Sequence, residues 1–215
     1  MRTPTRITNA FIRRGGRLTR PLLVAALAAG LVLAGSSAAQ AQSITNVDTA
    51  GDMVGVDYET GETRPAPNQV RNDVLSTTMT HNATRISIRV KYAELQRVGE
   101  GNGLFVQMVT NEGARRNLEV SAGPGDWAGS MWMSRGRDGN EVRCAIRHSI
   151  DYTRNVIAVS FPRQCASSPR WVRFRVLGYR FADNGAFYLD DALRDEPFLG
   201  ENPAQSRRVY RASSL

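Results

Sequence analysis

The strongest constraint on the fold is an alternation of apolar and polar residues that recurs from Asp73 onward. The clearest run extends from Ile86 to Tyr92, where apolar side chains alternate with serine, arginine and lysine. The same pattern recurs over 142–147 and 172–176. Successive side chains of a strand point to opposite faces of the sheet, so each run predicts a strand with one buried and one solvated face.

Further candidate strands are weaker and cover 73–80, 104–110, 117–121, 127–134 and 156–161. Turn-forming residues separate the runs, including Asp138-Gly139-Asn140 and His81-Asn82-Ala83, because Asn, Asp and Gly tolerate positive φ. Short strands spaced in this way are typical of an all-β sandwich. The sequence therefore predicts a single antiparallel β-sandwich, jelly-roll-like, with about eight strands.

The first 41 residues have the features of an export signal. Six arginines lead into an apolar run from Leu22 to Ala34, and Ala39-Gln40-Ala41 is a small-residue cleavage site. The apolar run is too short to span a bilayer. We expect cleavage near Ala41 and a secreted, extracellular chain without a membrane anchor.

The basic charge of the chain belongs mostly to this leader. The formal net charge is +8, but residues 1–41 hold six of the 28 basic residues and none of the 20 acidic ones, which leaves a net +2. This balance gives no support to a nucleic-acid partner. Lys91 is the sole lysine, and so strong a use of arginine is typical of a GC-rich, bacterial coding sequence.

The remaining 174 residues suit one domain with its own core. We expect an N-terminal strand and loop over 42–72, the sandwich core over 73–196, and a polar tail over 197–215. Cys144 and Cys165 are the only cysteines, and in an oxidising compartment such a pair predicts a disulfide.

Two acidic segments near the ends of this domain are candidate metal ligands. Asp48 and Asp52 precede the first core strand, and Asp190 and Asp191 follow a run of apolar and aromatic residues. Calcium takes six to eight oxygen ligands, carboxylates among them, and the ends of a domain often lie close together. The sequence predicts a structural calcium at these four residues, with ordinary turns and strand ends as the alternative.

The stretch Phe187-Tyr188-Leu189-Asp190-Asp191-Ala192 resembles the last strand of jelly-roll carbohydrate-binding modules. The element from Asp48 to Asp52 and the strand from Thr84 to Tyr92 resemble DOMON-like and family-nine carbohydrate-binding domains. These resemblances imply a secreted sandwich with a calcium near its last strand. The heme ligands of some DOMON domains match no motif here, so heme is not implied.

Aromatic rings supply flat apolar surface for sugars, and Trp127 and Trp132 are the candidates, with Trp171 as a third. Filling the core is the alternative role for each tryptophan. Arg135 lies in the same hairpin and is a candidate for an anionic sugar.

Enzyme motifs are missing: there are two histidines and no Gly-x-Ser-x-Gly. The sequence thus favours a secreted, non-catalytic module that binds extracellular or cell-envelope glycan. The alternatives are a hydrolase with a carboxylate pair and a domain that binds or inhibits an extracellular protein.

Overall fold

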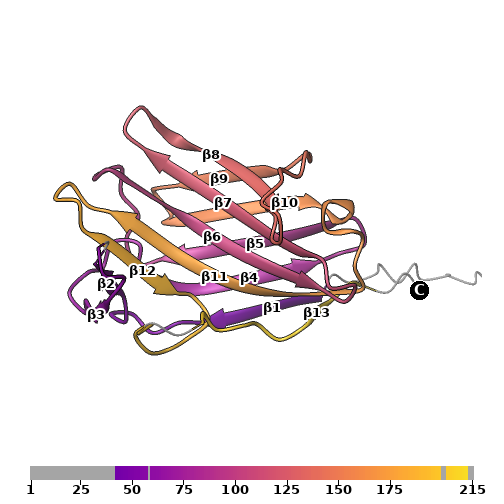
Figure 1. The fold of residues 1–215 in the computed structure, drawn as a ribbon, viewed down its shortest axis with the longest axis horizontal. Helices are drawn as coiled ribbons and strands as arrows, with labels where there is room; N and C mark the ends of the chain where they lie inside the picture. The colour runs from indigo at the N-terminus through magenta and orange to yellow at the C-terminus, as the bar shows by residue number, and fades with distance from the viewer. Residues whose placement is uncertain (1–41, 58, 200–201, 213–215) are drawn as a thin grey trace, which may run out of the picture. The chain divides into compact units, whose positions relative to one another are not determined.

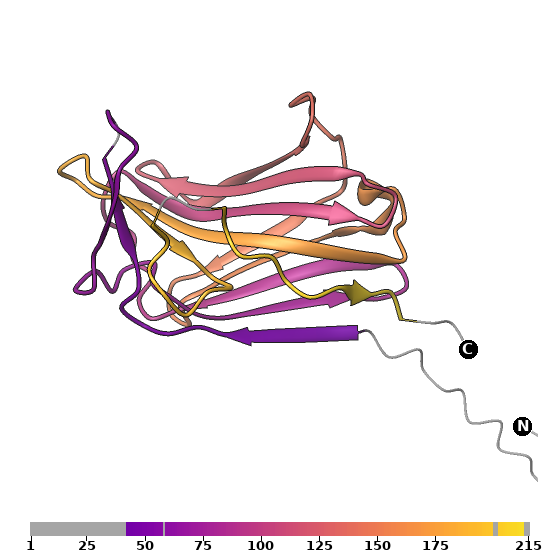
Figure 2. The ribbon, with the colours of Figure 1, turned by 60° about the horizontal axis from the view of Figure 1, so that its bottom comes forward.

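The computed structural model describes residues 42–57, 59–199 and 202–212, which form an all-β fold. Two antiparallel sheets pack against each other, as the sequence predicts, and Figures 1 and 2 show the two layers. Within these ranges the one helical element is a 3-10 turn, η1 (Arg163–Ala166). No helix in these described ranges is long and apolar enough to cross a membrane. The predicted export signal lies outside the described residues.

The five-stranded sheet has the order β1-β4-β5-β10-β9. Its strands are β1 (Gln42–Val47), β4 (Val74–His81), β5 (Arg85–Tyr92), β9 (Arg147–Asp151) and β10 (Val156–Pro162). The His81-Asn82-Ala83 turn joins β4 to β5 as predicted, and the Asn82 side chain closes it by accepting the Arg85 backbone N–H at 2.6 Å.

The eight-stranded sheet has the order β3-β2-β12-β11-β6-β7-β8, and β13 pairs with β11 outside this path. Its strands are β2 (Val54–Val56), β3 (Thr63–Pro65), β6 (Gly101–Thr110), β7 (Arg115–Gly123), β8 (Asp126–Arg135), β11 (Trp171–Phe181), β12 (Phe187–Asp191) and β13 (Val209–Tyr210).

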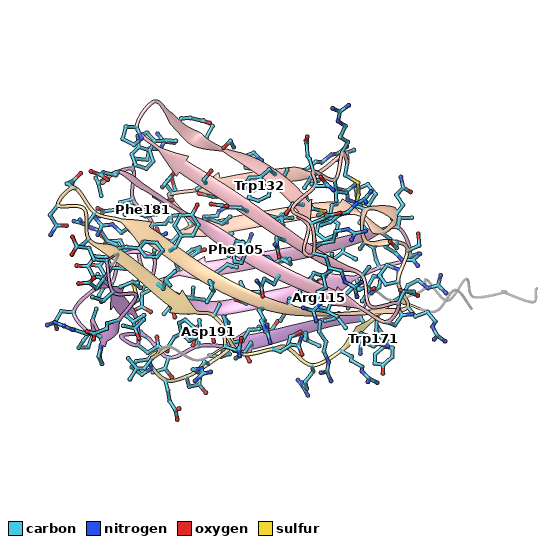
Figure 3. All side chains as sticks on the ribbon, viewed as in Figure 1. Phe105, Arg115, Trp132, Trp171, Phe181 and Asp191 are labelled. Carbon is cyan, nitrogen blue, oxygen red and sulfur yellow. A yellow bond between two sulfur atoms is a disulfide. The ribbon has the colours of Figure 1, made fainter. Side chains whose placement is uncertain are left out.

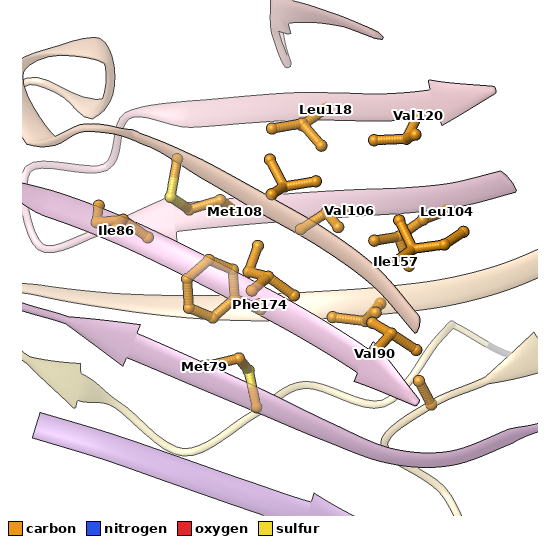
Figure 4. Close-up of a cluster of buried hydrophobic side chains, with 14 of the residues drawn as sticks. Met79, Ile86, Val90, Leu104, Val106, Met108, Leu118, Val120, Ile157 and Phe174 are labelled. Atoms are coloured by element: carbon orange, nitrogen blue, oxygen red, sulfur yellow. The ribbon is translucent and has the colours of Figure 1, made fainter. Parts of the chain in front are cut away.

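The core lies between the sheets and follows the alternation in the sequence. β5 contributes Ile86, Ile88 and Val90, and these side chains are buried. β11 contributes Phe174 from the facing sheet, with Val172 and Val176 beside it; Figure 4 shows part of this cluster. In both strands, the residues that point into the core are those that the alternation of apolar and polar residues predicted to be buried.

The described residues form thirteen strands where the sequence indicated about eight, because short strands extend both sheets. β3 lies in the predicted N-terminal strand and loop over 42–72, and β13 lies in the predicted polar tail. Val209 of β13 is fully buried, so this part of the tail belongs to the core. The predicted strand over 142–147 was wrong in most of its length: residues 142–146 alternate in burial but form no strand, and the pairing there is limited to the bridge between Glu141 and Ser134 and the hydrogen bond from Val142 N to the Met133 carbonyl.

The disulfide between Cys144 and Cys165 is present, with the Cα atoms 6.0 Å apart. It ties the irregular segment over 142–146 to η1. That segment lacks a continuous ladder of backbone hydrogen bonds, so the crosslink holds it at the edge of the core. Closing a loop of this length stabilises a fold by about 3 kcal/mol in the chain-entropy model.

Candidate functional site

Three buried aspartates converge from distant parts of the chain: Asp52, Asp73 and Asp190, which we call the carboxylate cluster. A carboxylate oxygen of each lies within 4.8 Å of one from both others. Asp52 precedes β2, Asp73 precedes β4, and Asp190 lies on the inward side of β12. Asp73 is 0% exposed and Asp190 is 1% exposed.

Local backbone geometry brings Asp73 to this position. Asn72 has a positive φ of 65°, which turns the chain into β4. Gly178 lies opposite Asp190 on β11, and a Cβ at Gly178 would come within 3.1 Å of the Asn72 carbonyl oxygen. The missing side chain therefore lets the segment that carries Asp73 approach β11 and β12 closely.

Each carboxylate of the cluster has a buried oxygen without a hydrogen bond in the described structure. Asp73 Oδ2 accepts the Gly51 N–H at 2.7 Å, and Asp190 Oδ2 accepts the Val74 N–H at 2.5 Å. The Oδ1 atoms of all three aspartates are buried and unpartnered within the described structure. Buried polar atoms without partners are rare in folded proteins and call for an explanation.

Burial raises the pKa of each aspartate in the cluster. Burial, together with the nearby carboxylates, raises the pKa of Asp190 to about 8 and that of Asp52 to about 6. Burial also raises the pKa of Asp73. Asp48 lies beside the cluster, and burial and the charge of Asp190 raise its pKa to about 9. Across the described residues, no arginine or lysine forms an ion pair with these four side chains.

Of the four predicted calcium ligands, the structure places Asp48, Asp52 and Asp190 together but turns Asp191 away. Asp191 accepts the Ala204 N–H at 2.6 Å and forms an ion pair with Arg194 at 3.5 Å. It holds the segment after β12. Asp73 takes its place in the cluster, although nothing in the local sequence marks Asp73 as a ligand.

The outer face of the eight-stranded sheet carries a second candidate site. This site is a hollow of about 260 Å³, which we call the aromatic face. Its apolar lining residues are Phe105, Leu177, Tyr179, Phe181, Phe187 and Leu189. Phe181 and Phe187 are cross-strand neighbours whose rings stack with centroids 4.6 Å apart. Figure 3 shows Phe105, Phe181 and Trp132 along this sheet.

Glu119 on β7 joins the aromatic face to Trp132. Its Oε1 accepts the Tyr179 hydroxyl at 2.9 Å, and its Oε2 accepts the Trp132 Nε1–H at 3.2 Å. Tyr179 lies over Gly103, its partner on β6, where a Cβ would come within 2.5 Å of the tyrosine ring. Trp132 remains 45% exposed beside this network.

A polar hollow of about 340 Å³ continues from the aromatic face. It shares Glu119, Tyr179 and Phe181 with that face. Its other lining residues include Glu100, Asn102, Ser121, Asp126 and Ser130. The combined surface thus places flat apolar rings next to hydroxyl, amide and carboxylate groups, which can form hydrogen bonds with a hydroxylated ligand.

The other candidate ligand-binding residues lie apart from this surface. Trp127 is half-buried and packs edge-on against Tyr152 with centroids 6.3 Å apart. The guanidinium of Arg208 lies over the Trp171 ring, 4.6 Å from its centroid. Arg135 is exposed and forms an ion pair with Asp138 at 3.9 Å.

Arginines line a separate groove on the same sheet, toward the end opposite Phe181 (Figure 3). This arginine groove has a volume of about 400 Å³, and Arg115, Arg116, Arg175, Gln107, Asn117 and Gln205 are among its lining residues. The Nε atom of Arg175 is buried and has no hydrogen-bond partner in the described structure. No described acidic residue forms an ion pair with Arg115 or Arg175.

The fold and its surfaces define a disulfide-linked, two-sheet β-sandwich with a buried carboxylate cluster and an aromatic outer face. Comparison of the chain with protein-family models, curated proteins and solved structures returned no match.

Proposed function

We propose that this protein is a secreted, non-catalytic module that binds extracellular or cell-envelope glycan through the aromatic face. The observation that carries the proposal is the group of rings on the outer side of the sheet, where they fill no core. Apolar rings on a solvated sheet face suit the apolar faces of sugar rings. The carbohydrate-binding modules that the last strand resembles are consistent with this function.

The Glu119 network supports the proposal because it fixes two rings at once. A ring whose position is fixed before binding loses less conformational freedom when a ligand arrives. The adjoining polar hollow supplies Ser121, Ser130 and Asn102 for hydroxyl groups. Both oxygens of Glu119 already accept hydrogen bonds, which favours a positioning role for this carboxylate over a catalytic one.

The arginine groove extends the proposal to acidic glycans. Phe105 belongs to the aromatic face and Gln107 to the arginine groove, and alternate residues of a strand lie about 7 Å apart. One extended chain can therefore contact both surfaces. Guanidinium groups form paired hydrogen bonds with carboxylate or sulfate groups, so we infer that the ligand carries such groups.

Removing a ring from the aromatic face, or the Trp132 ring that Glu119 joins to it, should weaken glycan binding. We expect Phe187→Ala and Trp132→Ala each to lower the affinity for a bound polysaccharide about tenfold, equivalent to about 1.4 kcal/mol. Affinity gel electrophoresis with a panel of soluble plant and bacterial polysaccharides identifies the ligand, and titration calorimetry gives the change.

Tyr210→Ala is the matched control, because Tyr210 is also 45% exposed but lies on β13, outside the aromatic face. Its affinity should equal that of the wild type. Equal losses in Tyr210→Ala and Phe187→Ala would contradict the proposed site. Release of reducing sugar would support the hydrolase alternative, and an extracellular protein bound in place of any glycan would support the protein-binding alternative.

Charge selectivity should depend on Arg175. Wild-type protein should bind polygalacturonate more tightly than its methyl ester, and Arg175→Met should reduce this preference severalfold. Arg89→Met is the control, since Arg89 is an exposed arginine on β5 of the other sheet. A preference that persists in Arg175→Met would place the acidic group elsewhere while leaving the aromatic site intact.

A further inference from the structure

We infer that the carboxylate cluster of Asp52, Asp73 and Asp190, with Asp48 beside it, is a binding site for one calcium ion that joins three distant segments of the chain. This inference goes beyond glycan binding and does not depend on it. The four aspartates come from the segment before β2, the start of β4 and the end of β12. An ion at this position therefore connects both sheets.

Unsatisfied oxygens carry the inference. Asp73 and Asp190 are at least 99% buried, and the Oδ1 atom of each has no hydrogen-bond partner in the described structure. Asp52 Oδ1 and Asp48 Oδ2 are also buried and have no hydrogen-bond partner there. Buried acceptor atoms without donors suit a cation, and the carboxylates of Asp52, Asp73 and Asp190 approach one another closely enough, within 4.8 Å, for one ion to contact all three.

The chemistry of the donors selects the ion. Hard carboxylate oxygens suit calcium or magnesium and disfavour metals that prefer nitrogen or sulfur ligands. Magnesium requires a near-ideal octahedron and usually keeps several waters, whereas calcium accepts six to eight oxygens in irregular geometry. A buried site with several carboxylates is therefore better suited to calcium.

Substitution by asparagine tests the site without changing the size of the side chain. In the wild-type chain, calcium chloride should raise the melting temperature by several degrees relative to EDTA, and magnesium chloride should do so much less. Titration calorimetry should give one calcium per chain. Asp73→Asn should lose both effects, yet in EDTA it should melt above the wild type, because one of the repelling carboxylates is gone.

Asp191→Asn is the matched control. Asp191 is also buried and adjoins Asp190 in sequence, but its carboxylate binds the Ala204 N–H and Arg194. Calcium should still stabilise this variant. A wild-type chain that shows neither calcium binding nor a calcium-dependent melting shift would overturn the site, as would full calcium stabilisation of Asp73→Asn. Neither outcome affects glycan binding by Phe187 and Trp132.

Discussion

In the presence of a chelator, the protein is expected to be most stable in mildly acidic solution and to lose roughly 5 kcal/mol of its free energy of unfolding by pH 9. Burial raises the pKa of Asp190 to about 8, while the pKa values of Asp52 and Asp48 rise to about 6 and about 9. An unfolded aspartate has a pKa near 3.9, and one pKa unit is equivalent to about 1.4 kcal/mol. The raised pKa of Asp190 alone corresponds to this loss, and the raised pKa values of Asp48 and Asp52 change stability in the same direction.

The free energy of unfolding falls with rising pH because the folded state holds more protons than the unfolded state. Between pH 4 and pH 9 the folded chain keeps protons on these carboxylates that the unfolded chain has released. The stability that these protonated carboxylates contribute to the folded chain is therefore fully present below pH 4. It decreases as the pH rises through 6, 8 and 9. Urea denaturation in EDTA at pH 5, 7 and 9 measures the trend. Asp190→Asn should flatten it, whereas a wild-type stability that rises with pH would contradict this account.

Gly103→Ala is expected to lower the free energy of unfolding by about 3 kcal/mol, at the upper end of the usual cost of overpacking. A Cβ at this position would lie 2.1 Å from the Val120 carbonyl oxygen and 2.5 Å from the Tyr179 hydroxyl oxygen. The backbone contact cannot be relieved by a side-chain rotation, so β6 and β7 must separate locally. Tyr179 must also leave Glu119, so glycan affinity should fall together with stability.

Gly55→Ala is the control for this substitution. Gly55 lies on β2 of the same sheet, and a Cβ there would have its nearest neighbour at 3.7 Å, an ordinary van der Waals distance. Denaturation and glycan titration of both variants should separate a specific close contact from a general effect of alanine in strands. Equal stability of the two variants would show that the sheet tolerates a side chain at Gly103.

Strand alternation predicted the core well, but it gave little guidance on the aromatic face. In β5 one face is apolar and the other is charged, so the inward side is unambiguous. In β6 apolar residues occupy both faces, with Leu104 and Val106 inward and Phe105 outward, and the period of two cannot separate them. The pairing of β6 with its neighbouring strands, and the packing of the two sheets, determine which rings lie on the outer face.

A turn signal could have located part of the aromatic face. Asn184-Gly185 marks a hairpin turn, and the turn that forms is a three-residue loop over 183–185 with a positive φ at Gly185, which places Phe181 directly opposite Phe187. That register alone puts two rings side by side on one face of a sheet. The partners on β6 and β7 come from longer connections and could not be read from local sequence.

For the candidate metal ligands, too, the local sequence predicted part of the site, and the packing of distant segments determined the rest. Neighbouring residues of a strand point to opposite faces, which was sufficient reason to separate Asp190 from Asp191. Asp73 could not be found in this way, because it reaches the cluster only through the packing of β4 against the other sheet.

The long sequence separations within the carboxylate cluster affect how the chain reaches its native state. The hydrogen bond between Val74 N and Asp190 Oδ2 joins residues 116 positions apart. Contacts of such long range lower the folding rate, because the intervening chain must be ordered first. In the unfolded chain the aspartates are separate, hydrated and, at neutral pH, ionised. Without a cation, their mutual repulsion therefore opposes the late step in which the two sheets close, and it does not affect the formation of individual hairpins.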